Sequence, residues 1–267
     1  MKPARFEYER PSDLAGALAL LNQSDRDVKL IAGGQSLGPM LNLRLAQPEL
    51  LVDIRRLAET TRVETHGDGV TIGACVTHAA IEDGKVEDPT NGMLASVAAG
   101  IAYRAVRNRG TVGGSLAHAD PAADWPTALA ALGAELLVVG PGGKRTVPVA
   151  DLMLGMFMTT LEPAEIIEAV RVPKLSKDAR WGYYKLCRKA GEFAQASAAV
   201  VRDPARNVAR AVVGATGSAP IVVADAAALM TDAAAQAALI DAHPLAEDPY
   251  ERQIHLVALQ RAIKQTL

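Results

Sequence analysis

Two Gly-Gly segments of the same form constrain the fold of this chain more than any other feature of its sequence. In the first, an apolar run that begins at Lys29 ends in Gly33 and Gly34, with a serine two residues later. The second segment, Arg109 to Leu116, reads RGTVGGSL and also ends in Ser-Leu. A Gly-Gly pair leaves backbone N–H groups open where a side chain would block approach, and the serine adds a rotatable donor. This chemistry suits a phosphate or pyrophosphate, so the pair predicts a dinucleotide held between the two segments.

Either segment alone is also typical of a tight turn that closes a strand, because glycine is the default turn residue. Neither segment contains the G-x-x-x-x-G-K-[ST] pattern of a P-loop, and neither reads G-x-G-x-x-G between a strand and a helix. A nucleotide bound by these segments therefore implies a fold other than the P-loop or Rossmann folds.

Composition limits the class of protein and its partners. The chain has 267 residues, of which 49% are hydrophobic and 22% charged, enough for one large domain or two modest ones. The net charge is −2 and no basic run is present, so we expect no nucleic-acid partner. The two cysteines, Cys75 and Cys187, lack CxxC spacing, so we expect neither a zinc site nor an iron–sulfur cluster within this chain. The sequence lacks an apolar leader and any apolar run of membrane-spanning length, which predicts no integral membrane segment and a cytoplasmic location.

Hydrophobic periodicity predicts alternating strands and helices in the first two thirds of the chain. The predicted elements are a strand at 6–8, a helix at 14–22 capped by Ser12, strands at 28–32 and 50–54, a hairpin at 63–74, and helices at 77–83 and 93–106. Basic residues and Gly110 end the last of these helices, so the second Gly-Gly segment is predicted to be a loop that begins where a helix ends.

A cluster of polar residues follows that segment. His118, Asp120 and Asp124 are potential metal ligands, but no second histidine or HxxxH spacing supports a metal site. The favoured interpretation is that the two aspartates shape the loop and cap a helix at 127–132, with one free to accept hydroxyl protons from a ligand.

The remaining sequence predicts more strands and then helices. They are a strand at 135–139, strands within 181–201 and at 208–215 and 221–223, and helices at 224–229, 233–242 and 250–265. This pattern is typical of a sheet with helices on one side.

Five stretches together resemble the FAD-binding medium subunits of the molybdenum hydroxylases. They are AGGQSL at 32–37, RNRGTVGGSLAHADPAADWP at 107–126, EPAEIIEAVRVP at 162–173, and YYK at 183–185 with GEFA at 191–194. The likeness extends from near residue 3 to the C-terminal helix. It implies an α+β fold: a two-subdomain FAD-binding domain of the PCMH (vanillyl-alcohol oxidase-like) type, followed by a small C-terminal sheet-plus-helices domain. The implied boundaries are 1–57 and 58–173 for the two subdomains and 174–267 for the C-terminal CO dehydrogenase flavoprotein-like domain.

The resemblance also implies which residues contact FAD. The implied set is Ala32, Gly33, Gly34, Gln35, Ser36, Leu37, Ile101, Thr111, Val112, Gly113, Gly114, Ser115, Asp124, Ile167 and Lys185. Leu30, Ile31 and Tyr183, next to these residues in the sequence, complete the candidate cofactor-binding set. Ile101 is expected on the helix before the second segment. Tyr183, two residues before Lys185, is expected on the same side of a strand, where it either covers the isoalloxazine ring or is a core tyrosine. We expect a Gly33→Val, Gly114→Val double variant to fold but lose flavin.

No convincing nucleophile–base pair is visible, so the chemistry is expected to belong to the flavin, with no catalytic residue or metal ligand in this chain. The resemblance implies that electrons come from a small partner subunit with two [2Fe–2S] clusters, which takes them from a large molybdopterin subunit. They would pass to a quinone, NAD or oxygen, in a dimer of heterotrimers. Two alternatives stay open: a stand-alone FAD-dependent oxidase or reductase of the same fold, and a non-catalytic nucleotide-binding scaffold.

Overall fold

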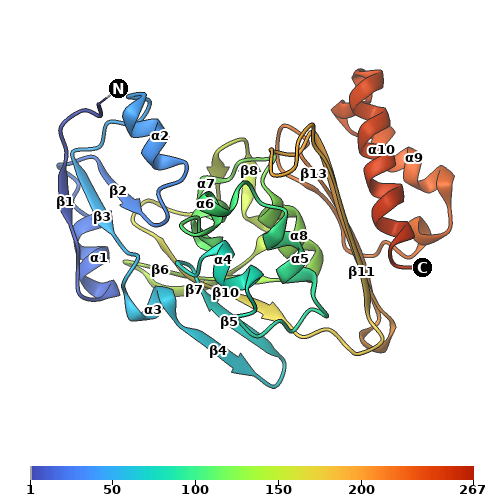
Figure 1. The fold of residues 1–267 in the computed structure, drawn as a ribbon, viewed down its shortest axis with the longest axis horizontal. Coiled ribbons are helices and arrows are strands. Elements are labelled where there is room, and N and C mark those ends of the chain that lie inside the picture. Colours follow the sequence, from blue (N-terminus) through green and yellow to red (C-terminus); the bar gives the residue numbers. More distant parts are fainter. Residues whose placement is uncertain (1) are drawn as a thin grey trace.

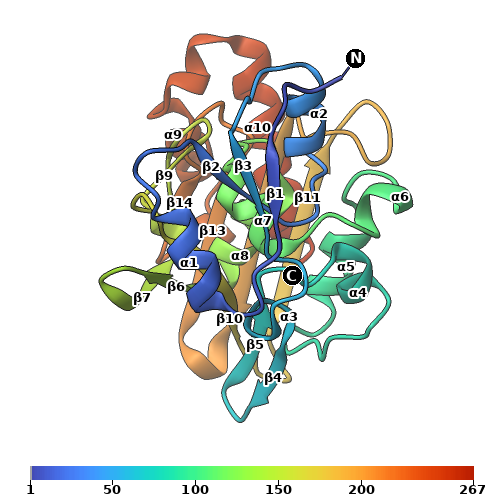
Figure 2. The same ribbon diagram turned by 90° about the vertical axis from the view of Figure 1, so that its left-hand side faces the viewer.

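The computed structural model describes residues 2–267 and places three structural units in a row (Figure 1). The first unit is a three-stranded parallel sheet of order β1-β3-β2, seen face on in Figure 2. Its strands are β1 (Glu7–Glu9), β2 (Val28–Ile31) and β3 (Leu50–Asp53), and its helices are α1 (Leu14–Leu21), α2 (Leu37–Asn42) and α3 (Ala58–Thr61). All four residues of β3 are buried, as expected of a central parallel strand covered on both faces.

The second unit is a five-stranded antiparallel sheet of order β4-β5-β10-β6-β7, with helices packed on it. Its strands are β4 (Val63–His66), β5 (Gly69–Gly73), β6 (Glu135–Gly140), β7 (Gly143–Pro148) and β10 (Ile166–Pro173), with a separate small hairpin of β8 (Met153–Gly155) and β9 (Met158–Thr159). Its helices are α4 (His78–Glu82), α5 (Met93–Ala99), α6 (Arg104–Arg107), α7 (Val112–His118) and α8 (Asp124–Leu132). The largest hydrophobic core of the protein lies here, around the fully buried Trp125.

The third unit is an antiparallel sheet of order β11-β12-β13-β14. Its strands are β11 (Arg180–Leu186), β12 (Ala196–Asp203), β13 (Val208–Gly214) and β14 (Ile221–Val223), and its helices are α9 (Ala233–Asp241) and α10 (Pro249–Lys264). Short 3-10 helices are present at Val149–Asp151, Pro204–Arg206, Ala228–Met230 and Pro244–Glu247. Helices α9 and α10 lie on one face, as predicted (Figure 1). The other face is covered by α8, whose nine residues are all buried between the second and third units.

Several predicted boundaries are wrong for identifiable reasons. The cap of α1 is Asp13, whose carboxylate accepts from the N–H of Gly16, rather than Ser12. The helix predicted at 93–106 is broken into α5 and α6, because the backbone of Ala102 turns to a φ of +44°. The helix predicted at 127 begins at Asp124.

Two predictions concerning longer stretches also need correction. The second Gly-Gly segment is the first turn of α7, with Thr111 as its N-cap, and not a loop. A helix predicted at 224–229 is only a 3-10 turn at Ala228–Met230. A hydrogen bond accompanies each difference. The Thr111 hydroxyl accepts from the N–H of Gly114 in the first turn of α7, whereas the N–H of Ala226 donates to Ala209 O and ties the chain to β13.

Candidate functional site

The two Gly-Gly segments, far apart in sequence, contact each other directly. A Cβ atom added to Gly33 would overlap the backbone oxygen of Arg109 and lie 2.8 Å from the Cα of Gly110. A Cβ added to Gly114 would lie 3.7 Å from the Cβ of Ala32. Gly33 is therefore required by the packing of one segment on the other, so the expectation that Gly33→Val leaves the fold intact is wrong.

The first segment carries a run of unused backbone donors. Within the described chain, residues 2–267, no hydrogen bond uses the N–H groups of residues 33–37, and none uses the Ser36 hydroxyl. Gly34 has a φ of +69°, the left-handed conformation that only glycine adopts at low cost. Successive unpaired N–H groups at a turn form an anion-binding concavity, so this segment fits a pyrophosphate.

The second segment differs, because its backbone donors are already taken. The N–H groups of Val112 and Gly113 donate to Val76 O at 3.1 Å and Ala74 O at 2.9 Å. Those of Gly114 and Ser115 donate to the side chain and backbone oxygens of Thr111, at 3.1 and 3.0 Å. The expectation of bare amides is thus wrong for these four residues. The segment instead has two features that a ligand could use. Gly114 has no side chain to block approach, and Ser115 carries a hydroxyl group.

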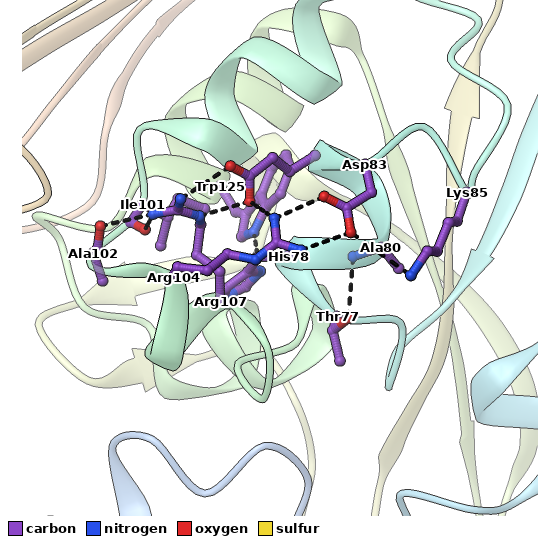
Figure 3. Close-up of polar contacts among 11 residues, drawn as sticks. Thr77, His78, Ala80, Asp83, Lys85, Ile101, Ala102, Arg104, Arg107 and Trp125 are labelled. Atoms are coloured by element: carbon purple, nitrogen blue, oxygen red, sulfur yellow. Dashed lines mark hydrogen bonds and ion pairs between the residues drawn. The ribbon is translucent and has the colours of Figure 1, made fainter.

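A buried histidine connects the second segment to α8. His78, at the start of α4, is 5% exposed, and its Nδ1 accepts a hydrogen bond from Trp125 Nε1 at 3.0 Å (Figure 3). Its backbone N–H donates to Gly110 O at 2.9 Å, and its ring lies against Gly110. Burial, with a smaller contribution from the charge of Arg107, lowers the pKa of His78 to about 4, so the ring is neutral at pH 7. Because Nδ1 accepts, the proton of the neutral ring is assigned to Nε2. The sequence alone gave no reason to single out His78.

Arg107 fixes the backbone between α5 and α6. Its guanidinium donates to Glu82 at 2.8 and 2.9 Å and to the carbonyl oxygens of Ile101 and Ala102 at 3.0 and 2.9 Å (Figure 3). Ile101 therefore lies in a turn held by Arg107, and its predicted placement on a helix is wrong.

Asp124 is the acceptor at the centre of a second polar group. Tyr183 Oη donates to Asp124 Oδ1 at 2.7 Å, and Lys185 Nζ donates to Asp124 Oδ2 at 3.0 Å. Lys185 Nζ also reaches the carbonyl of Gly100 at 3.4 Å. Burial raises the pKa of Asp124, whereas the Lys185 charge and the Tyr183 hydrogen bond oppose that rise. Burial and the Asp124 charge raise the pKa of Tyr183 well above 10.

The alternation prediction for β11 is confirmed, because Tyr183 and Lys185 reach the same carboxylate. The predicted cap role of Asp124 is wrong: Ala123 is the N-cap of α8, without a side-chain hydrogen bond. Asp120 does shape the loop, accepting the N–H of Ala122 at 2.9 Å.

The other predicted contact residues lie in several elements of the first and second units. Leu30 and Ile31 are in β2, Leu37 begins α2, and Ile167 is buried in the same core as Val112. His118 packs on the ring of Phe157 at 5.0 Å between centroids. In residues 2–267 no three His, Cys, Asp or Glu side chains are grouped so that they could hold a metal ion.

The family of the chain follows from comparison with known proteins. Residues 4–175 match the model of the FAD binding domain in molybdopterin dehydrogenase, and the chain belongs to this family. The carbon monoxide dehydrogenase medium chain of Hydrogenophaga pseudoflava is 42% identical over 221 residues, covering 82% of this chain and 77% of that one. The nicotine 6-hydroxylase medium subunit of Paenarthrobacter nicotinovorans is 41% identical, covering 81% and 77%.

Solved structures have the same fold over the whole chain. A carbon monoxide dehydrogenase structure from Hydrogenophaga pseudoflava superimposes with a TM-score of 0.90 and 36% identity, covering 100% of this chain and 98% of that one. Quinoline 2-oxidoreductase from Pseudomonas putida 86 gives a TM-score of 0.84 and 30% identity, covering 100% and 98%.

These findings confirm the resemblance and the mixed helix-and-sheet fold. The chain is an FAD-binding medium subunit of the molybdenum hydroxylase type, and it is part of an oxidoreductase. None of the helices in residues 2–267 combines the length and apolar character needed to cross a membrane.

Proposed function

We propose that this chain is the electron-transfer subunit of a heterotrimeric molybdenum hydroxylase. In this proposal it receives electrons from the [2Fe–2S] clusters of a small partner subunit and delivers them to an external acceptor, a quinone, NAD or oxygen. The electrons originate at a large molybdopterin subunit, the assembly is a dimer of heterotrimers, and it works in the cytoplasm. Bound FAD supplies the redox chemistry, and the chain itself contributes binding and electrostatics.

The observation that carries the proposal is the run of unused N–H groups at residues 33–37, packed directly against the second Gly-Gly segment. Five adjacent donors with no partner in the described chain are costly to leave unpaired when a ligand excludes water, and a pyrophosphate would accept from them. The backbone N–H groups of the first segment would then donate to the pyrophosphate. In the second segment, the absence of a side chain at Gly114 would let the ligand come close, and the Ser115 hydroxyl would add a donor.

The remaining residues in the proposed contact set have supporting roles. Ile101 and Ile167 would supply apolar contact. Asp124 and Lys185, with Tyr183, would form the polar end of the site. We propose domain boundaries at 1–57, 58–173 and 174–267, in line with the three larger sheets of the fold.

Two measurements test the proposal. The purified chain, mixed with FAD and freed of excess ligand, should show bound-flavin absorbance at about one FAD per chain. Native purification from its source should yield two further polypeptides, with iron and molybdenum in the complex. No flavin uptake by a folded chain would refute the cofactor site. Substrate turnover by the isolated chain would instead support a stand-alone flavoenzyme.

A further inference from the structure

Side chains from two elements, α8 and β11, meet at the Asp124 carboxylate, and the end of α5 contacts one of them. Asp124 lies in the first turn of α8, whereas Tyr183 and Lys185 come from β11 of the third unit. The two donors use different oxygens, Tyr183 at 2.7 Å from Oδ1 and Lys185 at 3.0 Å from Oδ2. Lys185 also contacts Gly100 O, at the end of α5, so its ammonium group is held beside the turn that contains Ile101.

The Asp124–Lys185 ion pair is buried, so its stability depends on the hydrogen bonds around it. The side chains of Asp124 and Lys185 are 4% and 10% exposed. An ion pair with little access to water is stable only when its remaining hydrogen-bonding capacity is also satisfied. Among the described residues Tyr183 is the only other side chain that donates to Asp124. Loss of its hydroxyl would leave Oδ1 without a side-chain donor, and the carboxylate would be free to rotate away from Lys185.

We infer that Tyr183 is a positioning residue: its hydroxyl orients the Asp124 carboxylate, which in turn holds the Lys185 ammonium at the Gly100–Ile101 turn. This assignment differs from the role of a ring cover, because the hydroxyl acts through Asp124 and Lys185 rather than on a ligand. For the effect on FAD it rests on the function proposed above. The network itself is testable without the cofactor.

The test is a double-mutant cycle with Tyr183→Phe and Lys185→Met, read out as the FAD dissociation constant by flavin fluorescence titration. Tyr183→Phe alone should weaken FAD binding about tenfold, the effect of one hydrogen bond to a charged group. In the Lys185→Met background the same change should alter affinity less than threefold. An equal effect in both backgrounds, or no effect of Tyr183→Phe on the unmodified chain, would overturn the inference.

Tyr184→Phe is the matched control, because it removes a hydroxyl from the next residue of β11 on the opposite face. The Tyr184 hydroxyl accepts from Arg261, whose guanidinium lies 4.8 Å from the ring centroid, and the residue packs on the other core. This variant should bind FAD with unchanged affinity.

The same four proteins of the cycle are unfolded in urea without FAD. If Tyr183 and Lys185 both act on Asp124, the midpoint of the double variant should be shifted by less than the sum of the single shifts. Additive shifts would overturn the network. If the unmodified chain binds no FAD, the proposed function fails, while the urea cycle still decides whether Tyr183 positions the pair.

Discussion

Acidification should destabilise the protein through His78 before most of its carboxylates are protonated. The ring is buried and lies near the charge of Arg107, and these two conditions lower its pKa from 6.5 to about 4. In the unfolded chain the same ring titrates near 6.5. Below that pH the ring is protonated in the unfolded state but stays neutral in the folded state until the pH approaches 4. The free energy of unfolding therefore falls as the pH falls.

The size of the loss follows from the difference between the two pKa values. A difference of roughly two to three pH units corresponds to about 3 kcal/mol, lost progressively between pH 6.5 and pH 4. At pH 5 roughly two thirds of this, about 2 kcal/mol, should already be gone. This is a large share of the 5–15 kcal/mol that is typical of a folded domain.

Urea unfolding at pH 7, 6 and 5 measures the effect, with His78→Gln as the matched variant. Gln offers an oxygen that can accept the Trp125 N–H but does not titrate. Burial also lowers the pKa of His243, which acts in the same direction, but this contribution is common to both proteins and cancels in the difference. The wild type should lose about 2 kcal/mol more than the variant between pH 7 and pH 5. Parallel pH profiles, or an NMR titration of the His78 ring near pH 6.5, would refute the reasoning.

The glycines and hydroxyls of the two segments give three further expectations. Gly33→Ala should lower the free energy of unfolding by about 3 kcal/mol, the upper range for overpacking. At Gly38 an added Cβ meets no atom within 4 Å, so Gly38→Ala should be neutral or stabilising. Urea titration compares the two variants. Ser36→Ala and Ser115→Ala should each weaken FAD binding by up to about tenfold with unchanged melting temperature, since neither hydroxyl is bonded within residues 2–267; equal affinity would remove both from the site. Thr111→Val should cost about 1 kcal/mol by loss of the N-cap, measured by thermal unfolding; an unchanged melting temperature would contradict the cap.

Short-range chemistry explains which parts of the fold could be predicted from sequence. The β11 alternation placed Tyr183 and Lys185 on one face because strand periodicity is local. The break after α5 could not be predicted, because the positive φ of Ala102 coincides with packing against Gly191, which is distant in sequence, as well as a bond from the nearby Arg107. Arg107 donates to its carbonyl, and Gly191 packs so closely on that carbonyl that a Cβ there would overlap it. Alanine carries no signal for such a conformation.

The convergence of distant side chains also lies beyond local rules. Asp124 was singled out by its motif, but its bonds to Tyr183 and Lys185 span 59 and 61 residues, and nothing in either stretch specifies the other. His78 was overlooked for the same reason, since its partner Trp125 lies 47 residues away. Such contacts depend on how the helices of the second unit pack against one another and against the third sheet, which the hydrophobic pattern alone does not determine.

The two Gly-Gly segments look alike in sequence, yet their glycines are needed for different reasons. In the first segment Gly33 allows backbone contact with the second, and the amides that follow are left without partners. In the second, the hydroxyl and carbonyl oxygens of Thr111 and the carbonyl oxygens of Ala74 and Val76, just after β5, accept from the amides, and Gly113 allows α7 to approach Ala74. Anion binding by backbone donors can therefore come from the first segment, while the second must contribute shape and the Ser115 hydroxyl. A substitution that displaces the backbone of the first segment should act on FAD affinity through misplaced donors, whereas a larger residue at Gly113 should act mainly through the position of α7.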